Sequence, residues 1–247
     1  MRKAFLALAI GLGILCSNRA VRADDVSAMM AQADAAYARR GEDLTQDKIA
    51  MLTYEKAAGV DPSHAVEAYW KAARAAWWLG EHDAARADRL EDYQKGMDDA
   101  RKAIVLNPDS VEAHFWLGGN EGSYGDTKGV MKSLGMVKPI RHEMAEVIRI
   151  NDRYNNGSAY QILGVVDYKV PGFIGGSKTR AKEELQKALV MGPNDPFHHY
   201  YMAEYWKITG DKEKLKAELN ILRTLQPSPD LLPETRMLQE RADQELK

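Results

Sequence analysis

The chain of 247 residues contains a single cysteine, Cys16, which lies in an apolar run near the N-terminus. If that run is removed on export, no thiol remains, and a disulfide, a cysteine nucleophile and a thiolate metal site are all excluded. Basic residues do not predominate either, because 34 lysines and arginines stand against 36 aspartates and glutamates. We therefore expect no nucleic-acid partner, since such a partner requires a strongly basic face.

A long hydrophobic run is also missing. Residues 4–16 form the longest one, and they are too few to span a membrane comfortably. They follow the basic start Met-Arg-Lys and lead to Val21 and Ala23, small side chains placed three and one residues before a cleavage point. This order is typical of a secretory signal peptide. We expect residues 1–23 to be removed and residues 24–247 to form one exported, periplasmic domain with no transmembrane segment.

A lipid anchor at Cys16 is less favoured than soluble export. Leu15 precedes this cysteine, at a position where a lipoprotein signal needs a small side chain. Cleavage after Ala23 would remove four basic residues and no acidic one, which leaves 30 basic and 36 acidic residues and a net charge of −6.

Patterns that carry catalysis are absent as well. None of the six histidines belongs to a His-Glu-x-x-His motif, and the neighbours His198 and His199 would point about 100° apart on a helix. No Gly-x-Ser-x-Gly motif occurs. Paired acids such as Asp98 and Asp99 stand beside lysines and arginines, as on solvated helix faces. We expect no enzyme activity, no metal and no cofactor.

Two short patterns do recur. The first ends in Leu-Gly and appears as AAWWLG (75–80), AHFWLG (113–118) and AYQILG (159–164), with a weaker copy HHYYMA (198–203). The second places small, aromatic or leucine side chains at offsets of four and three, starting at Ala50, Gly96, Ala181 and Leu215, and a proline follows five residues later. Such offsets lie on one helix face, and a proline ends the helix. Each unit is then two helices joined by a turn.

The stretch GFIGGSKT (172–179) differs by one residue from a phosphate-binding loop, because Ser177 replaces the second glycine. Such a loop follows a strand, whereas residues 158–168 align with the first helices of the other units. We interpret GFIGGS as a lengthened turn between two helices and Ser177 as the N-cap of the second one. Nucleotide binding is not expected.

These patterns resemble tetratricopeptide repeats (TPR) over roughly residues 45–227. The resemblance implies an all-α fold of TPR-like helical hairpins that form a compact right-handed superhelix. A narrower set of segments is similar to the periplasmic T-component family of TRAP transporters: SVEAHFWLGGNEG (110–122), KGVMKSLGMVKPIRHEM (128–144), NNGSAYQILG (155–164) and VPGFIGGSKTRAKEELQKAL (170–189). That likeness implies an exported binding or scaffold protein, an accessory of a solute transporter that acts with a periplasmic solute-binding protein.

Two other functions stay open: a carrier of a small apolar molecule or lipid, and a scaffold for envelope assembly. Formation of a homo-oligomer stays open too. The glycine-rich segment GGNEGSYGDTKG (118–129) falls in the longest repeat step and leads to a second helix expected at about residues 140–150. Its glycines suit either close helix contacts or a loose loop. The repeat predicts five core side chains: Leu117, Leu163, Ala181, Leu185 and Ala188.

The binding face is predicted on the first helix of each unit, on the stripe that points away from the Leu of Leu-Gly. In TPR proteins these positions line the concave surface that receives a partner. Packing between helices is the alternative role for the aromatic side chains among them. The predicted concave-face residues are Arg74, Trp77, Glu112, Phe115, Gln161, Tyr168, Phe197 and Tyr200.

Overall fold

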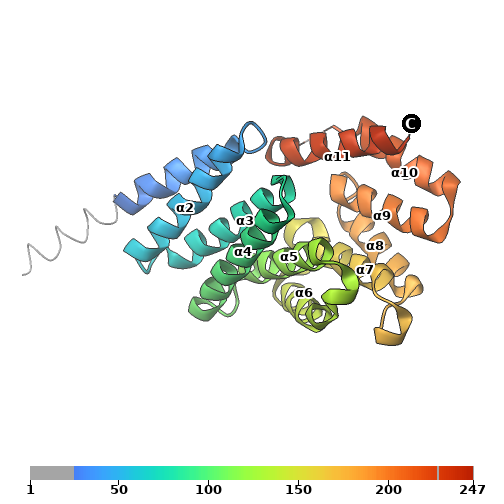
Figure 1. Ribbon diagram of the computed structural model, residues 1–247, viewed down its shortest axis with the longest axis horizontal. Coiled ribbons are helices and arrows are strands. Elements are labelled where there is room, and N and C mark those ends of the chain that lie inside the picture. Colours follow the sequence, from blue (N-terminus) through green and yellow to red (C-terminus); the bar gives the residue numbers. More distant parts are fainter. Residues whose placement is uncertain (1–24, 227, 247) are drawn as a thin grey trace, which may run out of the picture.

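The computed structural model describes residues 25–226 and 228–246. The predicted signal peptide, with Cys16, lies outside the described residues. Within the described ranges every regular element is a helix, which confirms the predicted all-α fold (Figure 1). After a helical segment at 25–38 come α2 (Leu44–Val60), α3 (Ala65–His82), α4 (Arg86–Leu106), α5 (Val111–Lys128), α6 (Val137–Asn151), α7 (Ser158–Lys169), α8 (Lys178–Met191), α9 (Pro196–Thr209), α10 (Lys212–Thr224) and α11 (Leu232–Glu245).

Consecutive helices pack as antiparallel hairpins, and the Leu-Gly copies lie on α3, α5 and α7, the first helices of their hairpins. The glycine of each pair leaves room for the next helix. A Cβ on Gly80 would overlap the ring of Tyr93 on α4, and a Cβ on Gly164 would lie 2.7 Å from Leu185 on α8. The predicted repeat of TPR-like hairpins is therefore confirmed.

Four of the five predicted core residues are buried: Leu117, Ala181, Leu185 and Ala188. The prediction for Leu163 was wrong in degree, because this side chain is only half-buried. Gly164 makes the tight contact with α8, so Leu163, about 100° further round the helix, lies at the edge of the cluster shared by α5, α6 and α7.

The glycine-rich segment is helical up to Lys128, so a loose loop is not what its glycines form. Gly118 lies tightly against Met144 of α6 and Gly125 lies 3.5 Å from Ser133, whereas a Cβ on Gly122 or Gly129 would meet no atom within 4 Å, so only part of the segment makes close contacts. The helix ends at Gly129, whose φ of 99° suits glycine. Two short 3-10 turns, η1 (Val130–Lys132) and η2 (Leu134–Met136), then lead into the expected second helix, α6.

The stretch before GFIGGS is the helix α7, as predicted, and not a strand. It follows the turn η3 (Tyr154–Gly157), in which Asn155, Asn156 and Gly157 are three successive left-handed residues. GFIGGS contains the 3-10 turn η4 (Gly172–Ile174), and the Ser177 side chain accepts a hydrogen bond from the backbone N–H of Arg180. Both predictions, the lengthened turn and the N-cap, are confirmed.

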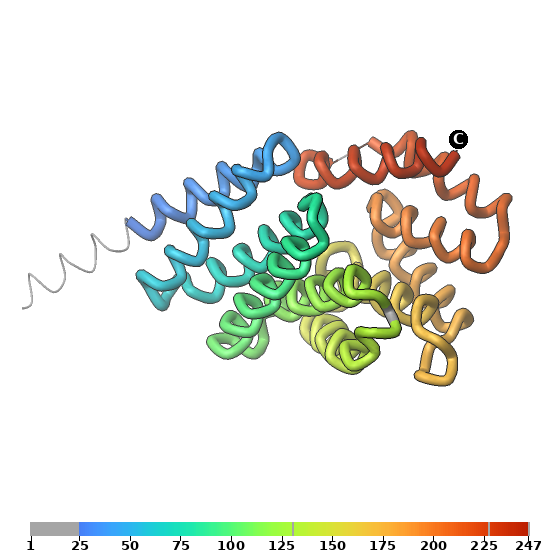
Figure 2. The backbone as a smooth tube through the Cα atoms, viewed as in Figure 1, coloured from blue at the N-terminus to red at the C-terminus, as the bar shows by residue number. Residues whose placement is uncertain are grey.

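The last helix closes the array. After α10, the turn η5 (Pro229–Leu231) leads into α11, which lies between the turn at 39–43 and the α9–α10 hairpin (Figure 2). Pro233 is 3.5 Å from the position that a Cβ on Gly41 would occupy. The two ends of the hairpin series thus meet, and α11 covers one side of the inner surface between them.

Candidate functional site

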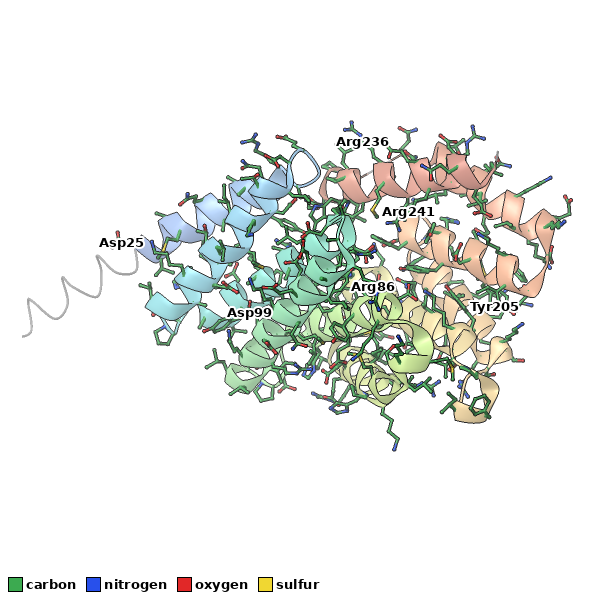
Figure 3. All side chains as sticks on the ribbon, viewed as in Figure 1. Asp25, Arg86, Asp99, Tyr205, Arg236 and Arg241 are labelled. Carbon is green, nitrogen blue, oxygen red and sulfur yellow. The ribbon has the colours of Figure 1, made fainter. Side chains whose placement is uncertain are left out.

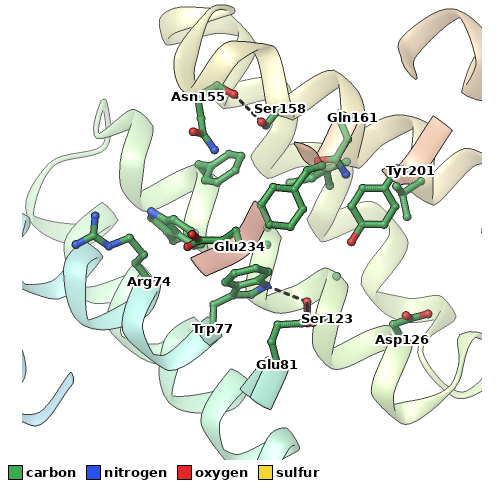
Figure 4. A pocket seen from close by; sticks show the side chains of 18 of the residues that line it. Arg74, Trp77, Glu81, Ser123, Asp126, Asn155, Ser158, Gln161, Tyr201 and Glu234 are labelled. Atoms are coloured by element: carbon green, nitrogen blue, oxygen red, sulfur yellow. Dashed lines mark hydrogen bonds between the residues drawn. The ribbon is translucent and has the colours of Figure 1, made fainter. Parts of the chain in front are cut away.

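A cavity of about 740 Å³ lies on the inner side of the array. Its walls are mainly the first helices of the hairpins, α3, α5, α7 and α9, and the N-terminal helical segment; η2 and the start of α6 also contribute, and η5 and α11 cover one side (Figure 4). First helices line the inside because each second helix packs on the outer side of its own hairpin. The cavity is therefore a direct product of the repeat.

Six of the eight residues predicted for the concave face line this one cavity. They are Arg74, Trp77, Phe115, Gln161, Phe197 and Tyr200. Four successive hairpins contribute to the set, so the stripe deduced from the repeat register converges in space. The surface is more enclosed than an open concave groove, since Phe115 and Gln161 are both buried.

The other two predicted residues, Glu112 and Tyr168, lie elsewhere. Glu112 is in the first turn of α5, where it accepts a hydrogen bond from the Ser110 hydroxyl at 3.1 Å. Tyr168 is buried in the contact of α7 with α9, its ring centroid 6.3 Å from that of Tyr205. Glu112 lies one turn before Phe115, which lines the cavity, whereas Tyr168 lies between the lining residues Val166 and Lys169 but is directed towards α9.

The aromatic side chains around the cavity form a connected cluster. The ring of Trp77 lies 5.7 Å from Trp116 and 6.1 Å from Phe197, centroid to centroid, and Phe115 lies 5.2 Å from Trp116 and 5.3 Å from Tyr154. Such contacts join α3, α5 and α9 and stabilise the hairpin array. The rings therefore pack between helices and also present apolar faces to the cavity.

A short hydrogen-bond chain fixes the orientation of Trp77. Its indole N–H donates to the Ser123 hydroxyl at 3.0 Å, and that hydroxyl donates to Glu81 at 3.1 Å (Figure 4). Glu81 also accepts a hydrogen bond from the hydroxyl of Tyr93 at 2.9 Å. The polar edge of the indole is thereby satisfied, which leaves the ring face as the surface offered to a ligand.

Two donors on the lining lack partners among the described residues. The Nε of Arg74 and the Nε1 of Trp116 are buried and make no hydrogen bond. The guanidinium of Arg74 stacks 3.9 Å from the ring centroid of Tyr37, and no carboxylate of the described chain lies within 4.0 Å of it. An unpaired cation on a cavity wall suits a ligand with an acceptor or acidic group.

An acidic side chain on this part of the cavity wall, Asp34, already has hydrogen-bond partners. Burial opposes ionisation of Asp34, but hydrogen bonds from Tyr54 and Lys71 outweigh it and lower the pKa of this carboxyl. Burial raises the pKa of both Tyr37 and Tyr154, so these phenols stay neutral near pH 7. Arg74 therefore faces neutral rings and a carboxylate that is bound by other groups.

Ion pairs on the cavity side hold the last helix, α11, against the rest of the array. The buried guanidinium of Arg40 donates to both carboxylate oxygens of Glu234, at 2.7 and 2.8 Å. Arg241 approaches Glu81 at 3.6 Å, and it lies on the inner face of α11 whereas Arg236 lies on the outer face (Figure 3). Removal of α11 would open the cavity to solvent.

Part of the wall of α5 is bare backbone. Gly118, Gly119, Gly122 and Gly125 line the cavity along this helix, and a Cβ added to Gly122 would meet no atom within 4 Å. The space beside Gly122 therefore belongs to the cavity and not to a helix contact.

Several residues that line the cavity were not predicted from the sequence. Trp116 and Tyr201 each follow a predicted residue by one position, because a cavity wall is wider than one helix stripe. Tyr154 comes from a turn, and Arg40 and Glu234 come from segments without a repeat pattern. The isolated Arg-Glu pair has no local signal that would have revealed it.

Two further features bear on the kind of site. In residues 25–226 and 228–246 no group of three or more His, Cys, Asp or Glu side chains has the arrangement to hold a metal ion. Over the same part of the chain, no helix is both long and apolar enough to cross a membrane.

The family model described as RMD1-3, Regulator of microtubule dynamics protein 1-3, matches residues 29–172. No curated protein matches the chain. Among solved structures, the chain is similar to TTC0263, a thermophilic TPR protein in Thermus thermophilus, with a TM-score of 0.64 and 17% identity over 88% of this chain and 98% of that one. It is also similar to the MamA protein, with a TM-score of 0.47 and 18% identity over 82% and 96% of the two chains. The likeness to TTC0263 confirms a TPR-like fold.

Proposed function

Because the chain belongs to the family described as RMD1-3, Regulator of microtubule dynamics protein 1-3, and has a TPR-like fold, we propose that it acts by binding and that the enclosed aromatic cavity is its binding site. The observation that carries this proposal is the convergence of Trp77, Phe115 and Tyr200, from three different hairpins, on one space of about 740 Å³. Ligand sites in proteins commonly have volumes of about 300–1,000 Å³.

The proposed occupant is a short segment of a protein partner, with an apolar body and one acidic or acceptor group. The aromatic cluster suits the apolar body. Arg74, which is unpaired and stacked on Tyr37, suits the polar group. TPR-like arrays commonly receive partners on this inner surface.

For the specific role of the protein we rely on the sequence resemblance to T-components. We propose an exported protein that binds a periplasmic solute-binding protein of a TRAP-type transporter. The similarity of residues 110–122, 128–144, 155–164 and 170–189 to T-components supports this choice. Co-purification of the chain with such a solute-binding protein tests it, and a chain that captures none of them at low ionic strength would contradict it.

A small apolar molecule carried in the cavity is the second candidate. It is favoured by one specific observation, the closure of the site by α11 through Arg40 and Glu234. A site covered on one more side shields more of a small molecule from water, whereas a peptide segment also needs room for the rest of its chain.

The experiment uses Gly122→Leu, which places a side chain in the cavity without a clash, and Gly59→Leu as the matched control. Gly59 is also a helix glycine with no atom within 4 Å of an added Cβ, but it lies outside the cavity. Native mass spectrometry detects small molecules that the protein retains, and affinity capture detects protein partners. We expect Gly122→Leu to lose the bound species and Gly59→Leu to keep it. Equal retention by both variants contradicts the proposed site.

A further inference from the structure

A second surface, at one edge of the array, combines the solvent-exposed sides of two segments that, on their inner sides, contribute Ser133, Met136 and Val170 to the cavity wall. One is the 3-10 region at 129–136, and the other is the loop at 170–178. Arg141 of α6 donates to the Gly175 carbonyl at 2.9 Å and pairs with Asp167. Met136 and Ile174 both pack against the hydrophobic cluster that contains Ile140, Met144 and Val147 of α6, so both segments are anchored to the core beside this helix.

Each segment exposes one large apolar side chain. Phe173 is 85% exposed and Met131 is 64% exposed. Phe173 stands between Val170, which is buried, and Ile174, which is partly buried against the same cluster. The loop thus presents its phenylalanine to solvent while its neighbours anchor it.

The loop has a defined conformation. The Gly176 N–H donates to the Pro171 carbonyl at 3.2 Å, and the Ser177 N–H donates to the Asp167 carbonyl at 2.9 Å. A Cβ on Gly176 would overlap the Val170 carbonyl, so only glycine fits there. The loop's own hydrogen bonds therefore hold the backbone around Phe173 in one conformation, with this side chain exposed.

The same edge is strongly basic. Residues 126–141 and residues 167–182 each carry a net charge of +3, in a chain whose net charge is −2. Lys132, Lys138 and Lys178 are exposed and have no ion pair within the described part of the chain. The charge of this edge is consequently available to an anionic partner.

An exposed apolar residue elsewhere lacks this setting. Val190, at the end of α8, is 83% exposed, but residues 183–198 around it carry a net charge of −2. Val190 therefore lacks the basic surroundings that Phe173 and Met131 have.

We propose that this edge, with Phe173 and Met131 at its tips and Lys132, Lys138 and Lys178 around them, docks on an anionic lipid bilayer surface. Phenylalanine and methionine would enter the interface between headgroups and acyl chains, and the lysines would remain among the anionic headgroups. A bilayer fits better than an acidic protein because Phe173 and Met131 are largely exposed apolar side chains with basic residues close to them in the sequence. This inference goes beyond the proposed function and does not depend on the cavity.

The test measures backbone hydrogen exchange along the full chain. Because this measurement reports on each segment, it distinguishes lipid contact at 129–136 and 170–178 from lipid contact at the apolar residues 4–16. Vesicles of phosphatidylcholine mixed with phosphatidylglycerol are compared with vesicles of phosphatidylcholine alone and with soluble polyglutamate. We expect slower exchange at 129–136 and 170–178 only with the anionic vesicles. Salt should weaken the effect, since the Debye length falls from about 10 Å at 0.1 M to about 3 Å at 1 M.

Matched variants separate the two contributions. Phe173→Ser should weaken the vesicle-induced protection and lower the apparent partition coefficient about tenfold, whereas Val190→Ser should leave both unchanged. Replacement of the three lysines by glutamine should lower the coefficient about 100-fold, and the same change at the exposed Lys48, Lys56 and Lys216 should have a much smaller effect. Absence of protection at the edge overturns the proposal. Equal protection by polyglutamate, with no effect of Phe173→Ser, also overturns it and assigns the edge to an acidic protein.

Discussion

Arg40 and Glu234 stand 194 positions apart in the chain and form a buried two-point ion pair, with nitrogen–oxygen distances of 2.7 and 2.8 Å. The same guanidinium donates to the Asp230 carbonyl and lies over the rings of Tyr37 and Trp78. Burial disfavours the charged form of Arg40. The hydrogen bonds that Arg40 donates to Glu234 outweigh this effect and raise the pKa of Arg40. This pair joins the first hairpin to the last helix and so encloses the cavity.

Loss of one partner should release α11. Glu234→Ala leaves the guanidinium of Arg40 buried without its counter-charge, which typically costs about 3–5 kcal/mol. We expect faster hydrogen exchange across 228–246 and a lower free energy of unfolding. The control is Arg236→Ala, on the exposed outer face of the same helix.

The double variant Arg40→Met with Glu234→Leu removes both charges and should recover much of the lost stability, because neither group is then left unpaired. If Glu234→Ala leaves exchange in α11 unchanged, the ion pair does not hold the closure.

Glu121 should make stability depend on pH. Its side chain is 3% exposed, and burial together with the nearby charge of Glu143 raises its pKa from 4.5 to about 7, although Arg101 donates to it at 3.2 Å. The folded protein therefore binds this proton more tightly than the unfolded chain. The resulting stabilisation is complete below pH 4.5 and is lost as the pH rises to about 7.

Glu121→Gln removes this ionisation. The free energy of unfolding of the variant, relative to the native protein, should rise with pH over that window by up to about 3 kcal/mol. Urea titrations at several pH values measure it, with Glu91→Gln at an exposed helix position as the control. Parallel pH profiles for Glu121→Gln and the native protein would show that Glu121 keeps an ordinary pKa.

The two leucines of the hairpin α7–α8 should differ in their contributions to stability. Leu185 is 0% exposed and fills the space left by Gly164, so Leu185→Ala should cost about 2–5 kcal/mol. Leu163 is half-buried, and its replacement by alanine should cost about half as much. Denaturant unfolding measures the loss in free energy of unfolding for both variants. Equal losses would mean that α7 is rotated relative to the orientation described above.

Two glycines offer a matched test of the repeat contact. Gly80→Ala forces a methyl group into the ring of Tyr93 and should destabilise the protein by about 1–3 kcal/mol. Gly59→Ala meets open space near the end of α2 and should stabilise it by up to about 1 kcal/mol. Thermal unfolding measures both, and a stabilising Gly80→Ala would contradict the close approach of α3 and α4.

The features that could be predicted from the sequence were those encoded by local periodicity. The Leu-Gly pairs and the small residues opposite them define each hairpin, and the cap at Ser177 depends on residues within one turn. Six of eight predicted inner residues reach the cavity for the same reason, since one helix stripe has a fixed direction relative to its hairpin.

The closure of the site could not be predicted in this way. The α11 helix carries no repeat pattern, and the pairing of Arg40 with Glu234 is a contact between distant segments with no sequence signature. Tyr168 was misplaced because the lining stripe of α7 runs through Ser158, Val165 and Lys169, and Tyr168, about 100° from Lys169 on the helix, is directed towards α9. The approximate direction of a stripe was predictable, but its exact centre depends on how the helices pack.

The five tryptophan indole N–H signals in a nitrogen-15 NMR spectrum test the central claim most directly, during titration with the apolar probe 1-N-phenylnaphthylamine. Trp70, Trp77 and Trp116 line the cavity, whereas Trp78 and Trp206 do not, so the chain supplies its own controls. We expect saturable shifts of the first three signals, little change in the other two, and loss of the response in Gly122→Leu but not in Gly59→Leu. Shifts confined to Trp78 and Trp206, or an unchanged response in Gly122→Leu, would contradict the assignment of the cavity as the binding site.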